Sequence, residues 1–137
     1  MTPLDFYRDH VMPHFNVSNK VCLVADPRPS NPPGNTYTVD FLGNVVGGKL
    51  TVYNNQPIDT LMDLAAKSIQ SGEPVWFGCD VSKYFMSKSG LLTMDVVDFE
   101  LVFDTNVHNW HSKADRLTYG DCAMNHAMLL TGVNIEV

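Results

Sequence analysis

The spacing of apolar and polar residues predicts three helices in this chain. The clearest lies in "PIDTLMDLAAKSIQSG" (57–72), where apolar residues recur three, four, seven and eleven positions after Ile58 and Gly72 supplies a stop signal. Two capping sequences, "TPLD" (2–5) and "SKAD" (112–115), predict the starts of the other two helices. We expect the first of these to end at Pro13 and the second to end at Gly120.

Short apolar or alternating runs predict the strands. They are "KVCLVADP" (20–27), "TYTVDFLGNVV" (36–46), "EPVWFGCDV" (73–81) and "MNHAMLLTGV" (124–133). The proline-rich run 27–35 predicts an exposed loop, 82–90 predicts a turn or short helix, and the pattern over 91–107 leaves the structure open. The order of elements favours an α+β domain with a largely antiparallel sheet.

Size and charge narrow the class of protein. A chain of 137 residues suits one domain, and a net charge of -6 without a lysine or arginine cluster argues against a nucleic-acid or basic membrane partner for this segment. No apolar stretch approaches a membrane span, and "MTPLDFYRDH" is too acidic for a signal peptide. Three separated cysteines fit a reducing cytoplasmic compartment, with Cys22 and Cys79 expected as buried free thiols.

Three groups of residues are candidates for chemistry. His108 and His111 in "HNWH" lack further metal ligands, so a solvated surface pair is favoured and no metal site is predicted. The acidic group Asp95, Asp98 and Glu100 is explained as well by a solvated edge as by acid–base chemistry.

The third candidate is His126, which stands near the start of a strand with apolar residues on both faces. Such a strand is expected to be buried on both sides, and a buried imidazole needs partners for both ring nitrogens. The pattern alone therefore favours a structural histidine over a catalytic one at the rim of a cleft.

A series of motifs from Thr2 to Val133 resembles the bleomycin hydrolase and aminopeptidase C family, the cytosolic aminopeptidase branch of the papain-like cysteine peptidases. The resemblance rests on these sequences in this order: "DPRP", "GNVVGGK", "VYNNQPIDTL", "GEPVWFGCDVSK", "ELVFDT", "KADRLTYGD" and "MNHAM". It implies that residues 1–137 are a partial papain-like domain, mainly the antiparallel sheet half that carries the catalytic histidine, with flanking helices.

The resemblance also implies residue roles. His126 matches the histidine that acts as general base and then as general acid, while Gly78, Asn125 and Ala127 would border the peptide substrate. It implies no metal or organic cofactor, a cytoplasmic location and a homo-hexamer.

Two parts of the family's site are missing from the sequence. The Gly-Cys-Trp nucleophile with its upstream glutamine has no match, and neither does the Asn-Ser-Trp-Gly segment that follows the histidine strand. We therefore expect the 137 residues alone to be inactive. The alternatives are a non-catalytic association module derived from the same fold, and an unrelated α+β binding protein in which His126 is structural.

Overall fold

The computed structural model describes residues 1–105 and 111–136. Its helices and strands are α1 (Pro3–Phe6), β1 (Leu23–Val24), β2 (Thr36–Thr38), β3 (Val52–Asn55), α2 (Ile58–Gln70), β4 (Val75–Cys79), β5 (Phe85–Met86), β6 (Leu91–Leu92), α3 (Phe99–Phe103), α4 (Lys113–Thr118) and β7 (His126–Leu130). A π-helical turn at Tyr7–Val11 continues α1, and 3-10 turns lie at Val17–Asn19 and Met94–Val96. No helix in these ranges is long and apolar enough to cross a membrane.

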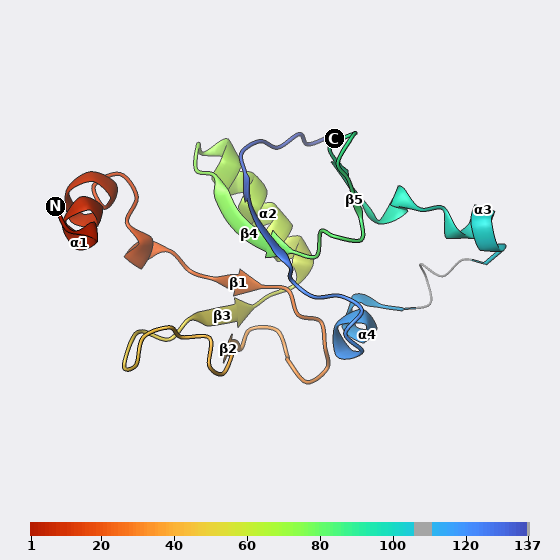
Figure 1. Ribbon diagram of the computed structural model, residues 1–137, viewed down its shortest axis with the longest axis horizontal. Coiled ribbons are helices and arrows are strands. Elements are labelled where there is room, and N and C mark those ends of the chain that lie inside the picture. Colours follow the sequence, from red (N-terminus) through yellow and green to blue (C-terminus); the bar gives the residue numbers. More distant parts are fainter. Residues whose placement is uncertain (106–110, 137) are drawn as a thin grey trace.

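The described strands form three small sheets, so the expectation of one sheet is wrong although most pairings are antiparallel. β3 lies between β1, which is parallel to it, and β2, which is antiparallel. β4 pairs with β7 and β5 pairs with β6, both antiparallel (Figure 1). The combination of helices with these sheets confirms the α+β class.

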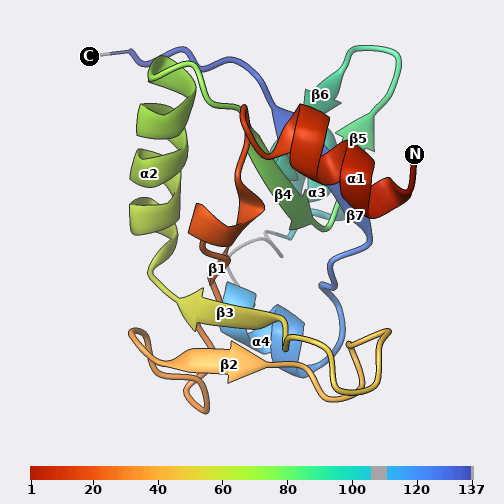
Figure 2. The same cartoon turned by 90° about the vertical axis from the view of Figure 1, so that its left-hand side faces the viewer.

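The predicted helix at 57–72 is confirmed as α2, and it lies beside β4 in both views (Figures 1 and 2). Leu61, Ala65 and Ile69 of its apolar stripe are half-buried. The helix stops because Gly72 takes φ +88°, a left-handed conformation that glycine adopts without a Cβ penalty.

Both predicted capping boxes are present. The Thr2 hydroxyl accepts from the Asp5 N–H, and the Asp5 carboxylate accepts from the Thr2 N–H. Ser112 and Asp115 repeat the arrangement at α4. After Phe6 the first helix widens into the π-helical turn, in which Met12 N–H donates to the Tyr7 carbonyl 2.8 Å away.

Other local expectations need correction. The strand expected over 36–46 covers only Thr36–Thr38, and β3 at Val52–Asn55 was not predicted. The segment expected as a turn or helix at 82–90 contains β5, which begins a hairpin with β6. Residues 91–105 hold β6, a 3-10 turn and α3, and the rest of the undecided stretch lies outside the described residues.

The most deeply buried side chain belongs to Asn55, which is 1% exposed. Its amide donates to the carbonyl oxygens of Asp26 (2.8 Å) and Asn31 (2.7 Å), and its Oδ1 accepts from the Asp26 N–H (2.8 Å). Asp26 in turn accepts from the Arg28 guanidinium and the Asn31 amide. These bonds anchor the proline-rich loop 27–35 to the end of β3.

Very little apolar side chain is fully buried in the described part of the chain. Among the described apolar residues, Val81 is the one that is buried, with 8% of its surface exposed. The solvent-accessible surface of the chain totals 10999 Å². The expectation that the His126 strand is buried on both faces is wrong. Ala127 and Leu129 are exposed because they lie on the face of the β4–β7 sheet that α2 does not cover, and His126 is exposed at the end of the other face.

Candidate active site

Pairing of β4 with β7 brings together residues that are almost fifty positions apart. Cys79 lies directly opposite His126, and Gly78 lies opposite Ala127. Residues opposite one another in an antiparallel pair share a face, whereas successive residues alternate. His126 and Cys79 therefore occupy one face at the end of this sheet, and Gly78 and Ala127 occupy the other.

His126 is the first residue of β7, and its ring is exposed. Within the described ranges its imidazole makes no hydrogen bond, ion pair or ring contact. Both ring nitrogens are thus available to groups beyond these residues. Within these residues the ring is therefore not paired as a structural core histidine would be.

Gly78 lies against Met124, a residue that was not predicted from the sequence to be near it. A Cβ atom at position 78 would lie 2.4 Å from Met124 Sδ and 3.0 Å from Met124 Cγ. The Met124 side chain therefore lies over Gly78, and a glycine is what permits this position. Only the strand register, which sequence pattern does not reveal, could have identified Met124.

Asn125, expected at the substrate rim, has its amide engaged within the fold. Its Nδ2 donates to Asp80 Oδ1 (2.7 Å) and Ser82 Oγ (2.8 Å), and its Oδ1 accepts from the Val81 N–H (3.0 Å). The side chain thus joins the residue before His126 to the segment that follows β4.

The position of Cys79 opposite His126 does not make it a ready nucleophile. Burial raises the pKa of the Cys79 thiol, and the charges of Asp80 and Cys122 raise it further. The thiol is therefore protonated at neutral pH, whereas nucleophilic attack requires the thiolate. Cys79 and Cys122 are half-buried, but the expected burial of Cys22 is wrong, because this residue precedes the two-residue strand β1 on an exposed stretch of chain.

The other candidates have structural roles or lie apart. Asp98 caps α3 by accepting from the Leu101 N–H, and Thr93 accepts from the Asp95 N–H. His111 is exposed, and His108 lies outside the described residues. Across the described ranges no group of three or more His, Cys, Asp or Glu side chains is arranged to hold a metal ion.

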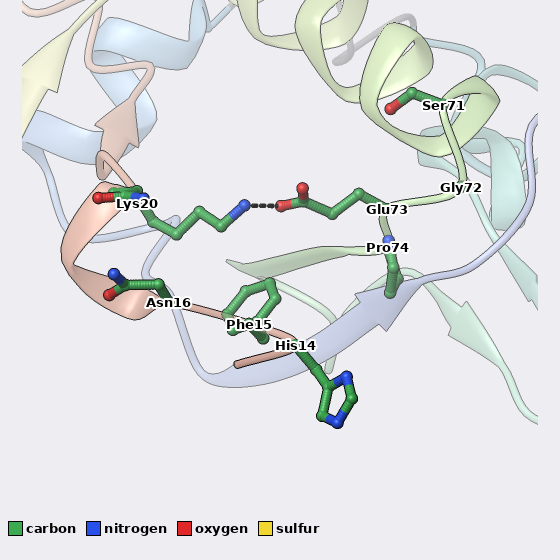
Figure 3. Close-up of a pocket in the computed structure, with 9 residues that line it drawn as sticks. His14, Phe15, Asn16, Lys20, Ser71, Gly72, Glu73 and Pro74 are labelled. Carbon is green, nitrogen blue, oxygen red and sulfur yellow. Dashed lines mark hydrogen bonds and ion pairs between the residues drawn. The ribbon is translucent and has the colours of Figure 1, made fainter. Parts of the chain in front are cut away.

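Two surface hollows lie away from His126, and the second of them is lined by His111 among other residues. One of about 430 Å³ lies between the stretch that contains His14 and Lys20 and the turn between α2 and β4 (Figure 3). Lys20 spans it, with its ammonium paired to Glu73 and 4.7 Å from the centre of the Phe15 ring. The other, of about 710 Å³, is lined by residues that include Tyr84 and Arg116. His126 lines neither of these two hollows.

His126 thus begins β7 with an exposed ring, and the other face of the sheet carries the small pair Gly78 and Ala127. Residues 1–137 match the model of the Peptidase C1-like family, and the chain belongs to that family of cysteine peptidases.

Comparison with curated proteins shows which members of this family the chain is similar to. The chain is 56% identical to bleomycin hydrolase of Gallus gallus over 134 residues, which are 98% of this chain and 29% of that protein. It is 54% identical to bleomycin hydrolase of Homo sapiens, again over 98% of this chain and 29% of the relative. Aminopeptidase C of Lactococcus lactis subsp. cremoris is 43% identical over 98% of this chain and 30% of its own length.

A solved structure has the same fold. PepW from Lactobacillus rhamnosis HN001 superposes with a TM-score of 0.90 at 38% identity, covering 99% of this chain and 30% of PepW. The chain therefore spans under a third of the length of the proteins it matches, and it has the partial papain-like fold that the motifs predicted.

Proposed function

We propose that this chain supplies the catalytic histidine and one wall of the substrate site to a cytoplasmic cysteine aminopeptidase of the bleomycin hydrolase type. The observation that carries the proposal is the exposed, uncommitted imidazole of His126 at the start of β7, in a chain of the Peptidase C1-like family. Residues 1–137 would be part of one papain-like domain, and peptides with a free N-terminus would be the substrates.

The chemistry assigns His126 two proton transfers. With a cysteine from another part of the domain, the imidazole takes the thiol proton, and the thiolate sulfur attacks the peptide carbonyl carbon. The imidazolium then gives its proton to the leaving amine nitrogen as the carbon–nitrogen bond breaks. Water, deprotonated by the same imidazole, hydrolyses the resulting thioester and regenerates the thiol.

Gly78 and Ala127 would border the substrate on this wall, whereas the amide of Asn125, which the resemblance places at the rim, is engaged within the fold. Gly78 and Ala127 are small and exposed on the face opposite to that of His126, so the substrate would lie over the end of the sheet, with a side chain along this face and its reacting carbonyl at the imidazole. Family analogy further supports a homo-hexamer as the assembled form.

The test uses chicken bleomycin hydrolase in which the matched stretch is replaced by this chain, hereafter the chimaera. We expect the chimaera to release N-terminal residues from peptides and His126→Ala to lower its kcat by at least about a thousand-fold, since members of such a catalytic unit act together. Cys79→Ser is the matched control and should retain activity. A folded chimaera that is inactive, or an active His126→Ala variant, would contradict the proposal.

A second test addresses the substrate wall. Ala127→Val adds bulk on the exposed sheet face that would border the substrate, so KM should rise in the chimaera. Gly132→Val is the matched control, because nothing lies within 4 Å of a Cβ atom at that position. An unchanged KM in the Ala127 variant would remove this residue from the site.

A non-catalytic association module is the second candidate, favoured by the apolar outer face of the β4–β7 sheet, where the cross-strand pair Trp76 and Leu129 is 75% and 50% exposed. A folded chimaera without peptidase activity would favour this alternative.

A further inference from the structure

The segment that follows β4 and the loop that precedes β7 are tied together by several hydrogen bonds. Asn125 N–H donates to the Cys79 carbonyl (3.2 Å), and Ala123 N–H donates to Asp80 Oδ2 (3.4 Å). At the far end of the loop, the Lys83 ammonium lies 2.6 Å from Asp121 Oδ1. The loop 121–125 is therefore attached along its length to residues 79–83.

The centre of this connection is the pair Asn125 and Asp80. Both hydrogens of the Asn125 amide nitrogen have acceptors, in Asp80 and Ser82, and the amide oxygen has a donor in the Val81 N–H. Hydrogen bonds in which one partner is charged, as the Asp80 carboxylate is, are stronger than those between neutral groups. An amide engaged at both ends has little left to offer a substrate.

The neighbouring residue is His126, whose own side chain has no anchor within the described ranges. The direction of its Cα–Cβ bond is set by the backbone on either side. On the β7 side the sheet register fixes that backbone, and on the other side the Asn125 side chain fixes it.

We propose that Asn125 and Asp80 form a clamp that positions His126 for proton transfer, so that Asn125 is a positioning residue rather than a substrate contact. This inference rests on the proposed function, because a clamp on His126 affects catalysis only if the imidazole is the general base. Proton transfer needs the donor and acceptor within hydrogen-bond reach, and a misplacement of about 1 Å can cost on the order of a hundred-fold in rate.

The experiment measures kcat and KM of the chimaera and of three variants. Asn125→Ala removes the clamp and should lower kcat by about 10–100-fold with KM unchanged. Asn125→Asp places two carboxylates against each other and should lower kcat at least as much.

The third variant is the double substitution Asn125→Asp/Asp80→Asn, in which the amide and the carboxylate exchange places. The amide introduced at position 80 can donate to the carboxylate introduced at position 125, which still accepts from the Val81 N–H. Most of the kcat lost in Asn125→Asp should therefore return.

Each outcome separates the clamp from the alternatives. A rise in KM with kcat unchanged would show that Asn125 contacts substrate, and a double variant as impaired as Asn125→Asp would show that the pair is not coupled; either result overturns the proposal. Thermal melts of all variants identify loss of folding, and the double variant keeps the test valid where Asn125→Ala does not fold. The His126→Ala variant distinguishes a failure of the clamp from a failure of the proposed function. If this variant is inactive while Asn125→Ala is fully active, the clamp fails and the proposed function stands.

Discussion

The exposed apolar surface predicts how the 137 residues behave when they are purified alone. A folded monomer of 15.3 kDa is expected to expose about 7,100 Å². The chain exposes 10999 Å². The excess is therefore on the order of 3,900 Å², as large as one of the most extensive obligate protein interfaces.

The energetic scale of this excess is large. If somewhat more than half of it is apolar, its burial contributes on the order of 50 kcal/mol at about 25 cal/mol per Å², as an upper bound. Net stabilities of folded domains are only about 5–15 kcal/mol. Without the surfaces that cover β4, β7 and the outer side of α2, the chain cannot offset the conformational entropy lost on folding.

We therefore expect the isolated chain to bind a hydrophobic dye, to self-associate as its concentration rises, and to unfold without a cooperative heat-capacity peak. The chimaera should be a well-defined oligomer with a cooperative transition. Within the isolated chain, Trp76→Ser/Leu129→Ser should reduce dye binding more than Val46→Ser, because the first two residues are paired on one face of the sheet whereas Val46 lies in a loop. A monomeric isolated chain that melts cooperatively and binds no dye would refute this reasoning.

Three further predictions concern the stability of the chimaera, measured by urea unfolding. Asn55→Ala should lower the free energy of unfolding by about 3 kcal/mol, since three hydrogen bonds of a buried amide are lost at about 1 kcal/mol each, whereas Asn44→Ala should have little effect. Hydrogen bonds from Arg28 lower the pKa of Asp26 from 3.8 to about 2. The carboxylate thus contributes about 2 kcal/mol above pH 4 that is lost as pH falls toward 2, and Asp26→Asn should abolish this part of the acid dependence. Gly72→Ala should cost about 1 kcal/mol because its φ of +88° is left-handed, and a loss below about 0.3 kcal/mol would contradict that assignment.

Elements that rest on local signals were predictable from the sequence. Both capping boxes, α2 with its glycine stop, and the strands β4 and β7 follow from spacing and from the residue types at their ends. β3 was missed because two of its four residues are asparagines, which are rare in strands. Its buried Asn55 is explained only by partners in the loop 27–35 and at Asp26, which sequence pattern cannot show.

The candidate site shows the same difference between residues with a local sequence signal and residues that depend on long-range pairing. His126 was singled out as a candidate through a resemblance of motifs, whereas the strand pattern alone favoured a structural role. Met124 over Gly78 and the Asn125–Asp80 pair were out of reach, because both depend on which residue of β4 faces which residue of β7.

That register also explains how so open a segment can hold a site in place. A two-stranded sheet alone is marginally stable, and α2 covers only one of its faces. The end that carries His126 nevertheless has the bonds of residues 79–83 to 121–125, which do not depend on an apolar core. The backbone at His126 is thus set locally by polar contacts, while Trp76 and Leu129 on the outer face of the same sheet stay exposed within the described residues.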